Sequence, residues 1–205
     1  FKIAVIVTVC GTLLAVLVAA ITAYPLSKRE IKGMKFLLVM FVFTMLFGGG
    51  IIPNYMLMKS LGITNNLLSL IFPPVINVFN ILVIKNYYET LPDSLEESAK
   101  LDGASYFTIL FRIVIPLSKP VLATVLVFFA VGFWNDFFSP MLYITKGSLK
   151  PLQLYLRDMV MEANDLTGLL SQSVDNQITP GGVRAASIIV STVPILLVYP
   201  YLQKY

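Results

Sequence analysis

The sequence predicts an all-α, polytopic membrane helix bundle, and three observations support this prediction. Of the 205 residues, 57% are hydrophobic and only 13% are charged, whereas a soluble domain carries about a quarter charged residues. The mean hydropathy is +0.82. The apolar residues also form stretches of about 20, the length that a helix needs to cross the hydrocarbon core. These stretches are 3–26, 36–58, 67–88, 120–143 and 183–201.

The first two stretches differ in regularity. Apart from one glycine, residues 3–26 are interrupted only by three threonines, so a continuous spanning helix is expected there. Residues 36–58 contain three consecutive glycines at 48–50, followed by Pro53. Because glycine and proline weaken a helix, a kink or an unwound turn is predicted at this point.

The other three stretches contain prolines. A Pro-Pro pair lies near the start of 67–88, with Asn77 and Asn80 further along. The stretch 120–143 opens with a proline, and 183–201 contains two. We therefore predict five transmembrane helices in one domain, 1–205.

Basic residues give the orientation. They are concentrated in the short connection 28–35 and in the longer connection 89–119, two spans apart. The positive-inside rule places both in the cytoplasm and the connection 145–180 outside. With five spans, Phe1 would lie outside and Tyr205 inside, so at least one further span is expected upstream.

The outer segment 145–180 contains an amphipathic pattern. Its polar positions fall opposite an apolar face, which indicates a helix that packs on the span ends or lies in the outer membrane interface. The expected apolar face is Leu152, Tyr155, Leu156, Met159, Val160 and Ala163; the opposite face is Gln153, Arg157, Asp158 and Glu162.

The connection 89–119 predicts a helix–turn–helix. Ser94 is a suitable N-cap for the first helix, and Glu97 would complete a capping box with it. Gly103 can adopt the positive φ that ends a helix. Ser105 can cap the second helix, which Pro116 is expected to stop.

This helix–turn–helix carries an apolar face on the water side of the membrane. Large exposed apolar patches are rare on solvent-facing surfaces. The face therefore either binds a partner or folds back on the span ends, and the residue pattern alone favours neither. Its residues are Leu101, Tyr106, Phe107, Leu110 and Phe111.

Several functional classes are unsupported. The sequence has no histidine and a single cysteine, Cys10, so no metal site and no catalytic base of the commonest kind is expected. No basic stripe studded with aromatic residues points to nucleic acid. The sequence that comes nearest to a phosphate-binding loop is Lys146-Gly147-Ser148. Its residues are in the wrong order for that motif, and the upstream glycine is missing.

The connection 89–119 also carries a family signature. The pattern Glu97-Ser98-Ala99, three residues, Gly103, nine residues, Ile113-Val114-Ile115-Pro116 resembles the "EAA" loop of permeases in binding-protein-dependent ABC importers. The departures are Ser98 for alanine and Ile115 for leucine. Further stretches, such as Trp134-Asn135-Asp136-Phe137, are similar to the carbohydrate branch, and the resemblance covers nearly the whole chain. Members usually have six spans.

The resemblance implies a division of labour. The loop would dock on cytoplasmic ATPase subunits, two per complex, which bind ATP and Mg, so this chain would need no cofactor and would not itself be an enzyme. A second permease subunit and an extracytoplasmic solute-binding protein would complete an importer of a sugar, expected to be an oligosaccharide, in the bacterial cytoplasmic membrane. The coupling residues implied are Glu97, Ser98, Ala99, Asp102, Gly103, Tyr106, Phe107 and Pro116.

Polar residues at membrane depth are the candidates for contact with the substrate. Trp134, Asn135 and Asp136 fall within the fourth span, where an ionisable group is costly and usually faces a cavity, a partner or the bundle interior. A tryptophan beside hydrogen-bonding side chains suits a sugar; packing against a second permease is the alternative. Asn77 and Asn80 are further candidates, with interhelical hydrogen bonding as their alternative role.

Two other transporter classes remain open. The same architecture could carry a non-sugar solute, which a binding assay on the partner receptor would reveal. An ion-coupled secondary transporter would need ion-coupling groups in the membrane and often has internal repeats. Here Asp136 is the single acid deep in a predicted span, and no repeat is evident.

Overall fold

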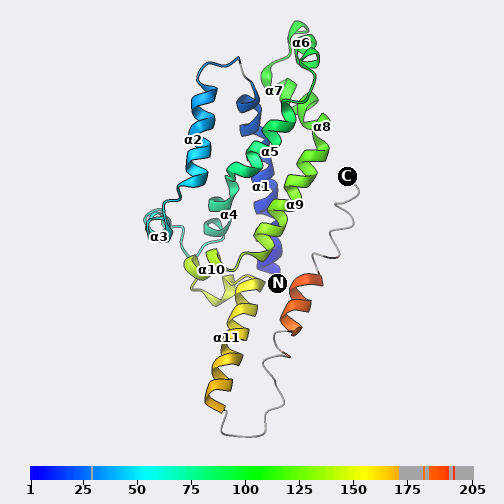
Figure 1. The fold of residues 1–205 in the computed structure, drawn as a ribbon. Helices are drawn as coiled ribbons and strands as arrows, with labels where there is room; N and C mark the ends of the chain where they lie inside the picture. Colours follow the sequence, from blue (N-terminus) through cyan, green and yellow to red (C-terminus); the bar gives the residue numbers. More distant parts are fainter. Residues whose placement is uncertain (29, 171–181, 183–184, 194–195, 197–205) are drawn as a thin grey trace.

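Helices account for all regular secondary structure in the described part of the chain, which confirms the predicted all-α class. The structure is a computed structural model that describes residues 1–28, 30–170, 182, 185–193 and 196. The helices form an elongated bundle (Figure 1), with α6 (Asp93–Leu101) at one end and α11 (Leu152–Leu170) at the other. The connection from α1 (Lys2–Ser27) to α2 (Met34–Leu46) lies at the α6 end, as the distribution of basic residues predicts.

Helix α1 is the centre of the bundle. It is continuous, as expected for the first span, and it is long and apolar enough to cross a membrane by itself. Ala15, Ala19 and Ala23 are fully buried at four-residue spacing, because small side chains allow neighbouring membrane helices to approach closely. The helices packed around α1 are α4 (Leu68–Val75), α5 (Val78–Tyr88) and α9 (Lys119–Asn135).

Gly11 lies in close contact with α9. A Cβ atom built there would lie 2.7 Å from Cε1 and Cζ of the Phe133 ring, which is itself buried. We expect Gly11→Ala to lower the free energy of unfolding by about 1–3 kcal/mol, since overpacking forces side chains off their rotamers. Gly132→Ala on the facing helix is the matched control, because no atom lies within 4 Å of a Cβ there. Equal thermal unfolding temperatures for the two variants in detergent would contradict the packing.

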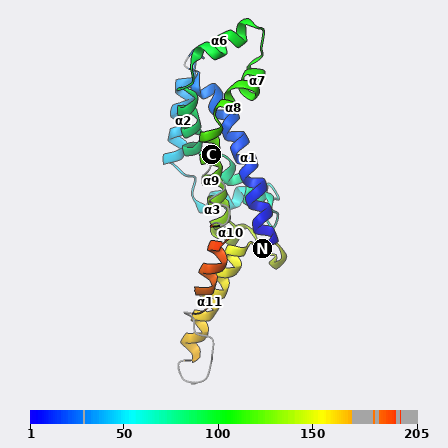
Figure 2. The ribbon, with the colours of Figure 1, turned by 90° about the vertical axis from the view of Figure 1, so that its right-hand side faces the viewer.

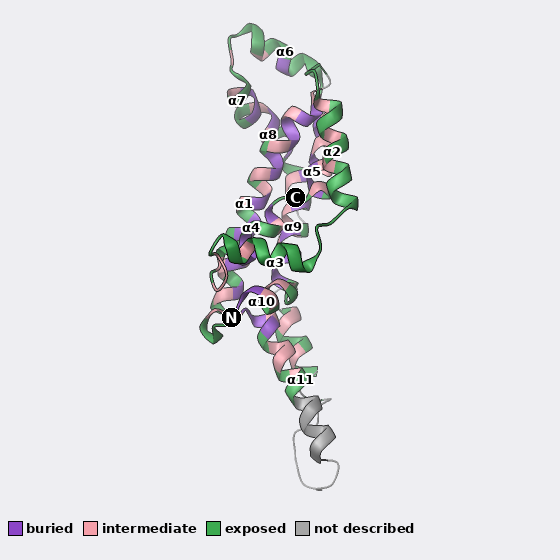
Figure 3. Ribbon diagram, turned by 90° about the vertical axis from the view of Figure 1, so that its left-hand side faces the viewer, coloured by how far each residue is buried: buried purple, intermediate pink, exposed green. Residues whose placement is uncertain are grey.

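The second span is broken where the glycines predict. Helix α2 ends at Leu46, α3 (Ile51–Ser60) begins after the three glycines, and the two axes differ by 108°. Gly50 has a φ of 87°, which favours glycine. Neither helix has a buried residue, and Figure 3 shows both exposed over most of their length.

The third span is also bent, by 46° between α4 and α5. The prolines lie inside α4, and the break follows them at Asn77, whose side-chain Oδ1 accepts a hydrogen bond from the Asn80 backbone N–H at 3.1 Å. Asn77 is thus the N-cap of α5. The described residues contain one helix long enough to span a membrane, or up to four spans if each bent pair counts as one.

The fourth span is shorter than predicted. Helix α9 ends at Asn135, and a separate helix, α10 (Phe138–Tyr143), follows. The expectation that Asp136 lies inside a continuous span is therefore wrong. Its Oδ1 accepts hydrogen bonds from the backbone N–H groups of Phe138 and Ser139, at 3.0 and 3.1 Å, so the carboxylate caps α10 instead.

Asn65 connects two loops at the α10 end of the bundle. Its Oδ1 accepts hydrogen bonds from the Thr145 N–H and hydroxyl and from the Lys146 N–H, at 2.7, 2.9 and 3.1 Å. Its own N–H donates to the Tyr143 carbonyl at 2.9 Å. Its φ is 57°, a conformation that asparagine tolerates better than most residues. A short 3-10 turn, Gly147–Leu149, then leads to α11.

Helix α11 forms as predicted but packs differently. Leu152 is buried and Leu156 half-buried against the ends of α1 and α9, whereas Tyr155 and Met159 are exposed. The predicted apolar face is therefore only partly correct, because α11 extends beyond the bundle (Figure 2) and its later turns lack the bundle as a neighbour. The Ala163 side chain lies outside what the structure describes.

The fifth predicted span, 183–201, lies only in part within the described residues. Residues 185–193 are helical and lie beside α11 in both views (Figures 1 and 2). Residues 183–184, 194–195 and 197–201 are outside the described part, as is 171–180 of the outer segment.

Candidate functional site

The connection 89–119 forms a helix–turn–helix at one end of the bundle, as predicted (Figure 1). The first helix, α6, begins at Asp93 rather than after Ser94. The predicted capping box is therefore wrong: Pro92, with extended backbone angles, precedes the helix, and no side chain caps it. Asp93 and Glu96 place carboxylates in the first turn, which the helix dipole favours.

The turn between the two helices is a Schellman motif. Gly103 has a φ of 80°, its N–H donates to the Lys100 carbonyl at 3.0 Å, and the Ala104 N–H donates to the Ala99 carbonyl at 2.9 Å. Two carbonyls that would otherwise be unpaired at the helix end are satisfied in this way. No atom lies within 4 Å of a Cβ built at Gly103. Backbone conformation, rather than space, therefore requires glycine here.

The second helix of the motif is longer than predicted. Ser105 caps it as expected, because its Oγ accepts a hydrogen bond from the Thr108 N–H at 3.2 Å. The helix continues through Pro116, which was expected to stop it. A π turn changes the hydrogen-bond register just before the proline, with Ile115 N–H donating to the Leu110 carbonyl. The chain then bends by 82° at Ser118. The successive segments are α7 (Tyr106–Ile109), a π turn (Leu110–Val114) and α8 (Ile115–Leu117).

The predicted apolar face divides into two parts. Leu110 is 3% exposed and belongs to the bundle core, so the fold-back alternative holds for this residue. Phe111 is 46% exposed. Leu101, Tyr106 and Phe107, which flank the turn, are 90%, 63% and 70% exposed. We call these three the exposed apolar patch.

The other predicted coupling residues surround the exposed apolar patch. Glu97 and Ser98 are exposed on α6, as is Asp102 just after its end, and Ala99 is half-buried. No ion pair reaches Glu97 from the residues that the structure describes. Pro116 is exposed but lies three helical turns beyond Gly103, near the bend into α9. The geometry thus brings seven of the eight together around the turn.

Sequence reasoning missed the neighbouring carboxylate, Glu96. It is the one buried residue of α6, at 8% exposure. Its Oε1 forms an ion pair with Lys28 Nζ, and its Oε2 accepts a hydrogen bond from the Tyr24 hydroxyl at 3.3 Å. Successive residues on a helix point about 100° apart, so Glu96 and Glu97 cannot both face the bundle. That rotation indicates that the two carboxylates point in different directions, but not which of them faces the bundle.

The predicted substrate-pathway residues mainly complete helix ends. Asp136 caps α10 and Asn77 caps α5, as described above, while Asn80 is buried and Asn135 exposed. Trp134 is buried, and its ring meets Phe1 edge-on at 5.8 Å between centroids. Its Nε1–H donates to the Ser191 carbonyl at 3.1 Å.

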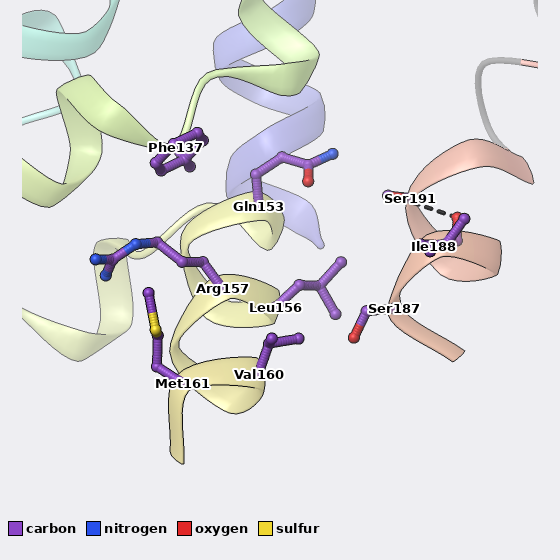
Figure 4. A pocket seen from close by; sticks show the side chains of 9 residues that line it. All are labelled: Phe137, Gln153, Leu156, Arg157, Val160, Met161, Ser187, Ile188 and Ser191. Carbon is purple, nitrogen blue, oxygen red and sulfur yellow. Dashed lines mark hydrogen bonds between the residues drawn. The ribbon is translucent and has the colours of Figure 1, made fainter. Parts of the chain in front are cut away.

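An open pocket of about 280 Å³ lies between α11 and helix 185–193 (Figure 4). None of the predicted pathway residues lines it. Since its walls come from two helices distant in sequence, no local pattern could have revealed it. The lining residues are Phe137, Gln153, Leu156, Arg157, Val160, Met161, Ser187, Ile188 and Ser191.

Comparison with known proteins gives consistent matches across the chain. The family model described as "Binding-protein-dependent transport system inner membrane component" matches residues 11–205. Two proteins of Bacillus subtilis are similar: Protein LplC, 46% identical over 99% of this chain and 69% of its own length, and the polygalacturonan/rhamnogalacturonan transport system permease protein YtcP, 41% identical over 99% and 71%.

A solved structure has the same fold. It is described as a bacterial ABC transporter involved in the import of the acidic polysaccharide alginate. It is similar to this chain with a TM-score of 0.87 and 34% identity, and the match covers all of this chain and 73% of the other.

Proposed function

Because the chain belongs to the family of binding-protein-dependent transport system inner membrane components, we propose that its exposed helix–turn–helix couples separate ATPase subunits to sugar movement through the bundle. The chain is a permease subunit of a sugar-transporting ABC importer and is not itself an ATPase. The single observation that carries the coupling proposal is the exposed apolar patch. Its three large side chains stay in solvent, while the helix that bears two of them is built into the core through Leu110.

This arrangement suits a docking element. A partner that covers Leu101, Tyr106 and Phe107 would bury apolar surface. Movement of that partner would then be transmitted along the second helix into α9. The exposed carboxylate of Glu97, beside the patch, would meet a basic residue of the same partner. ATP and Mg would be held by that partner, with two such subunits in each complex.

The remaining partners follow from the surfaces of this chain. Helices α2 and α3 have no buried residue, and we propose that lipid and a second permease subunit cover them. A solute-binding protein would deliver substrate at the opposite end, outside the bacterial cytoplasmic membrane. Residues 1–205 would act as a single permease domain that alternates between inward- and outward-open states.

The proposed substrate is an oligosaccharide. Of the similar proteins, YtcP is named for polygalacturonan and rhamnogalacturonan, and the solved transporter for the acidic polysaccharide alginate. We propose that the substrate passes near the helix breaks, where Trp134, Asn135 and Asp136 lie at one break and Asn77 and Asn80 lie at or next to the other.

Uptake into proteoliposomes tests this proposal. The complex would be purified through a tag on this chain and supplied with its binding protein, Mg-ATP and radiolabelled oligosaccharides, one neutral and one acidic. We expect uptake that requires ATP and is unchanged by ionophores. Uptake that persists without ATP and is abolished by ionophores would instead support an ion-coupled carrier.

A further inference from the structure

The first helix of the helix–turn–helix is attached to the bundle at very few points. Helix α6 shares no extended packing interface with another described helix, and Glu96 is its one buried residue. Figure 3 shows the rest of α6 exposed, apart from partly buried positions such as Ala99. The second helix differs, because Ile109, Leu110 and Val114 are all in the core.

Glu96 contacts α1 at the end nearest the cytoplasm. Besides the Lys28 ion pair and the Tyr24 hydrogen bond, Lys28 Nζ lies 5.1 Å from the centroid of the Tyr24 ring. Tyr24 packs edge-on against Tyr88 of α5, with ring centroids 6.4 Å apart. We call Tyr24, Lys28 and Glu96 the Glu96 cluster. A buried carboxylate is tolerated when it is paired and hydrogen-bonded, so this cluster favours one position of α6.

We propose that Glu96 is a positioning residue that transmits movement of α6 to α1 through Lys28 and Tyr24. This inference rests on the proposed docking of an ATPase subunit on the same loop. Two adjacent carboxylates would then have separate tasks: Glu97 faces the partner, whereas Glu96 faces the bundle. Since α1 packs against α4, α5 and α9, a displacement delivered to its end reaches most of the bundle.

The two helices of the loop would thereby act on different parts of the bundle. The second helix leads through the bend at Ser118 into α9, and the first acts on α1 through the Glu96 cluster. Because α1 and α9 pack on each other, the movements of the two loop helices would both act on the interface between α1 and α9. Loss of the cluster should leave the exposed apolar patch able to bind while uncoupling α6 from the spans.

Spin-label distances in the assembled complex test this inference. Labels would be placed on Ser94→Cys in α6 and Leu13→Cys in α1, both exposed positions, with Cys10→Ala to remove the native thiol. The probe is Mg-ATP trapped with vanadate. We expect the parent complex to give a narrow distance distribution that shifts on trapping. Glu96→Gln and Lys28→Met should each broaden the distribution and lose the shift, while the ATPase subunits still co-purify.

Three further variants make the test specific. Asp93→Asn removes an exposed carboxylate from the same helix and should leave the shift intact. Lys28→Arg should also retain it, and exchanging the charges, Lys28→Glu with Glu96→Lys, should restore it. A narrow distribution with a normal shift in Glu96→Gln, or an exchange that restores nothing, would overturn the inference. Failure of the parent complex to retain its ATPase subunits would instead overturn the proposed function.

Discussion

Gly103→Val is expected to abolish ATP-driven uptake, although a valine side chain has room at this position. The turn holds Gly103 at a φ of 80°, and no atom lies within 4 Å of its Cβ position. An L-residue in the left-handed region loses about 1–2 kcal/mol, and a β-branched residue is a clear outlier there. A strain of 1.4 kcal/mol lowers the equilibrium ratio of the native turn to other turn conformations about tenfold. Both Schellman hydrogen bonds would be lost with it, and the exposed apolar patch would be divided, because Leu101 precedes the turn whereas Tyr106 and Phe107 follow it.

Gly103→Asn is the matched control for this prediction. Asparagine enters the left-handed region far more readily than valine, and the open space accommodates its side chain equally well. Co-purification of the ATPase subunits and ATPase stimulation by the loaded binding protein should persist with asparagine and disappear with valine. If both variants lose coupling to the same extent, a side chain of any kind at 103 blocks docking, and backbone conformation is not the cause.

Features of the loop that depend on a few adjacent residues were predictable from the sequence. Gly103 and Ser105 were identified correctly, because a positive φ and an N-cap each depend on local chemistry. Ser94 and Pro116 were misjudged for a related reason. Each was predicted from a local rule. However, the helix starts two residues earlier than predicted, after Pro92, and the π turn allows the second helix to continue through Pro116.

Contacts between distant segments could not be predicted in the same way. Glu96 and Lys28 are separated by 68 residues, and no local pattern indicates which of two adjacent glutamates faces α1. Asp136 illustrates a different error, in which a local pattern led to a wrong prediction. Hydropathy placed it deep in a span, but hydropathy does not detect that α9 ends at Asn135 and that the carboxylate begins a new helix. Hydropathy therefore located the apolar helices, and the glycines located the break after Leu46, while the end of α9 depended on capping.

Phe107→Asp is expected to cause a large loss of ATPase binding while the helix–turn–helix itself stays folded. Phe107 is 70% exposed, so the permease has little need of it for its own fold. If it fills a pocket on the ATPase subunit, truncation of such an aromatic residue costs 2 kcal/mol or more, about 30-fold in affinity, and a buried unpaired carboxylate adds to that cost. Co-purified ATPase should fall accordingly, while the thermal unfolding temperature of the isolated permease stays unchanged.

Two comparisons separate docking from folding in this experiment. Phe107→Leu keeps an apolar side chain and should retain most of the binding. Leu110→Ala, three residues further along the same helix, removes a side chain that is 3% exposed and should lower the free energy of unfolding by about 2–5 kcal/mol. If Phe107→Asp instead destabilised the permease as Leu110→Ala does, the ring would have to pack within this chain. The exposed apolar patch would then provide no surface for an ATPase subunit to bind.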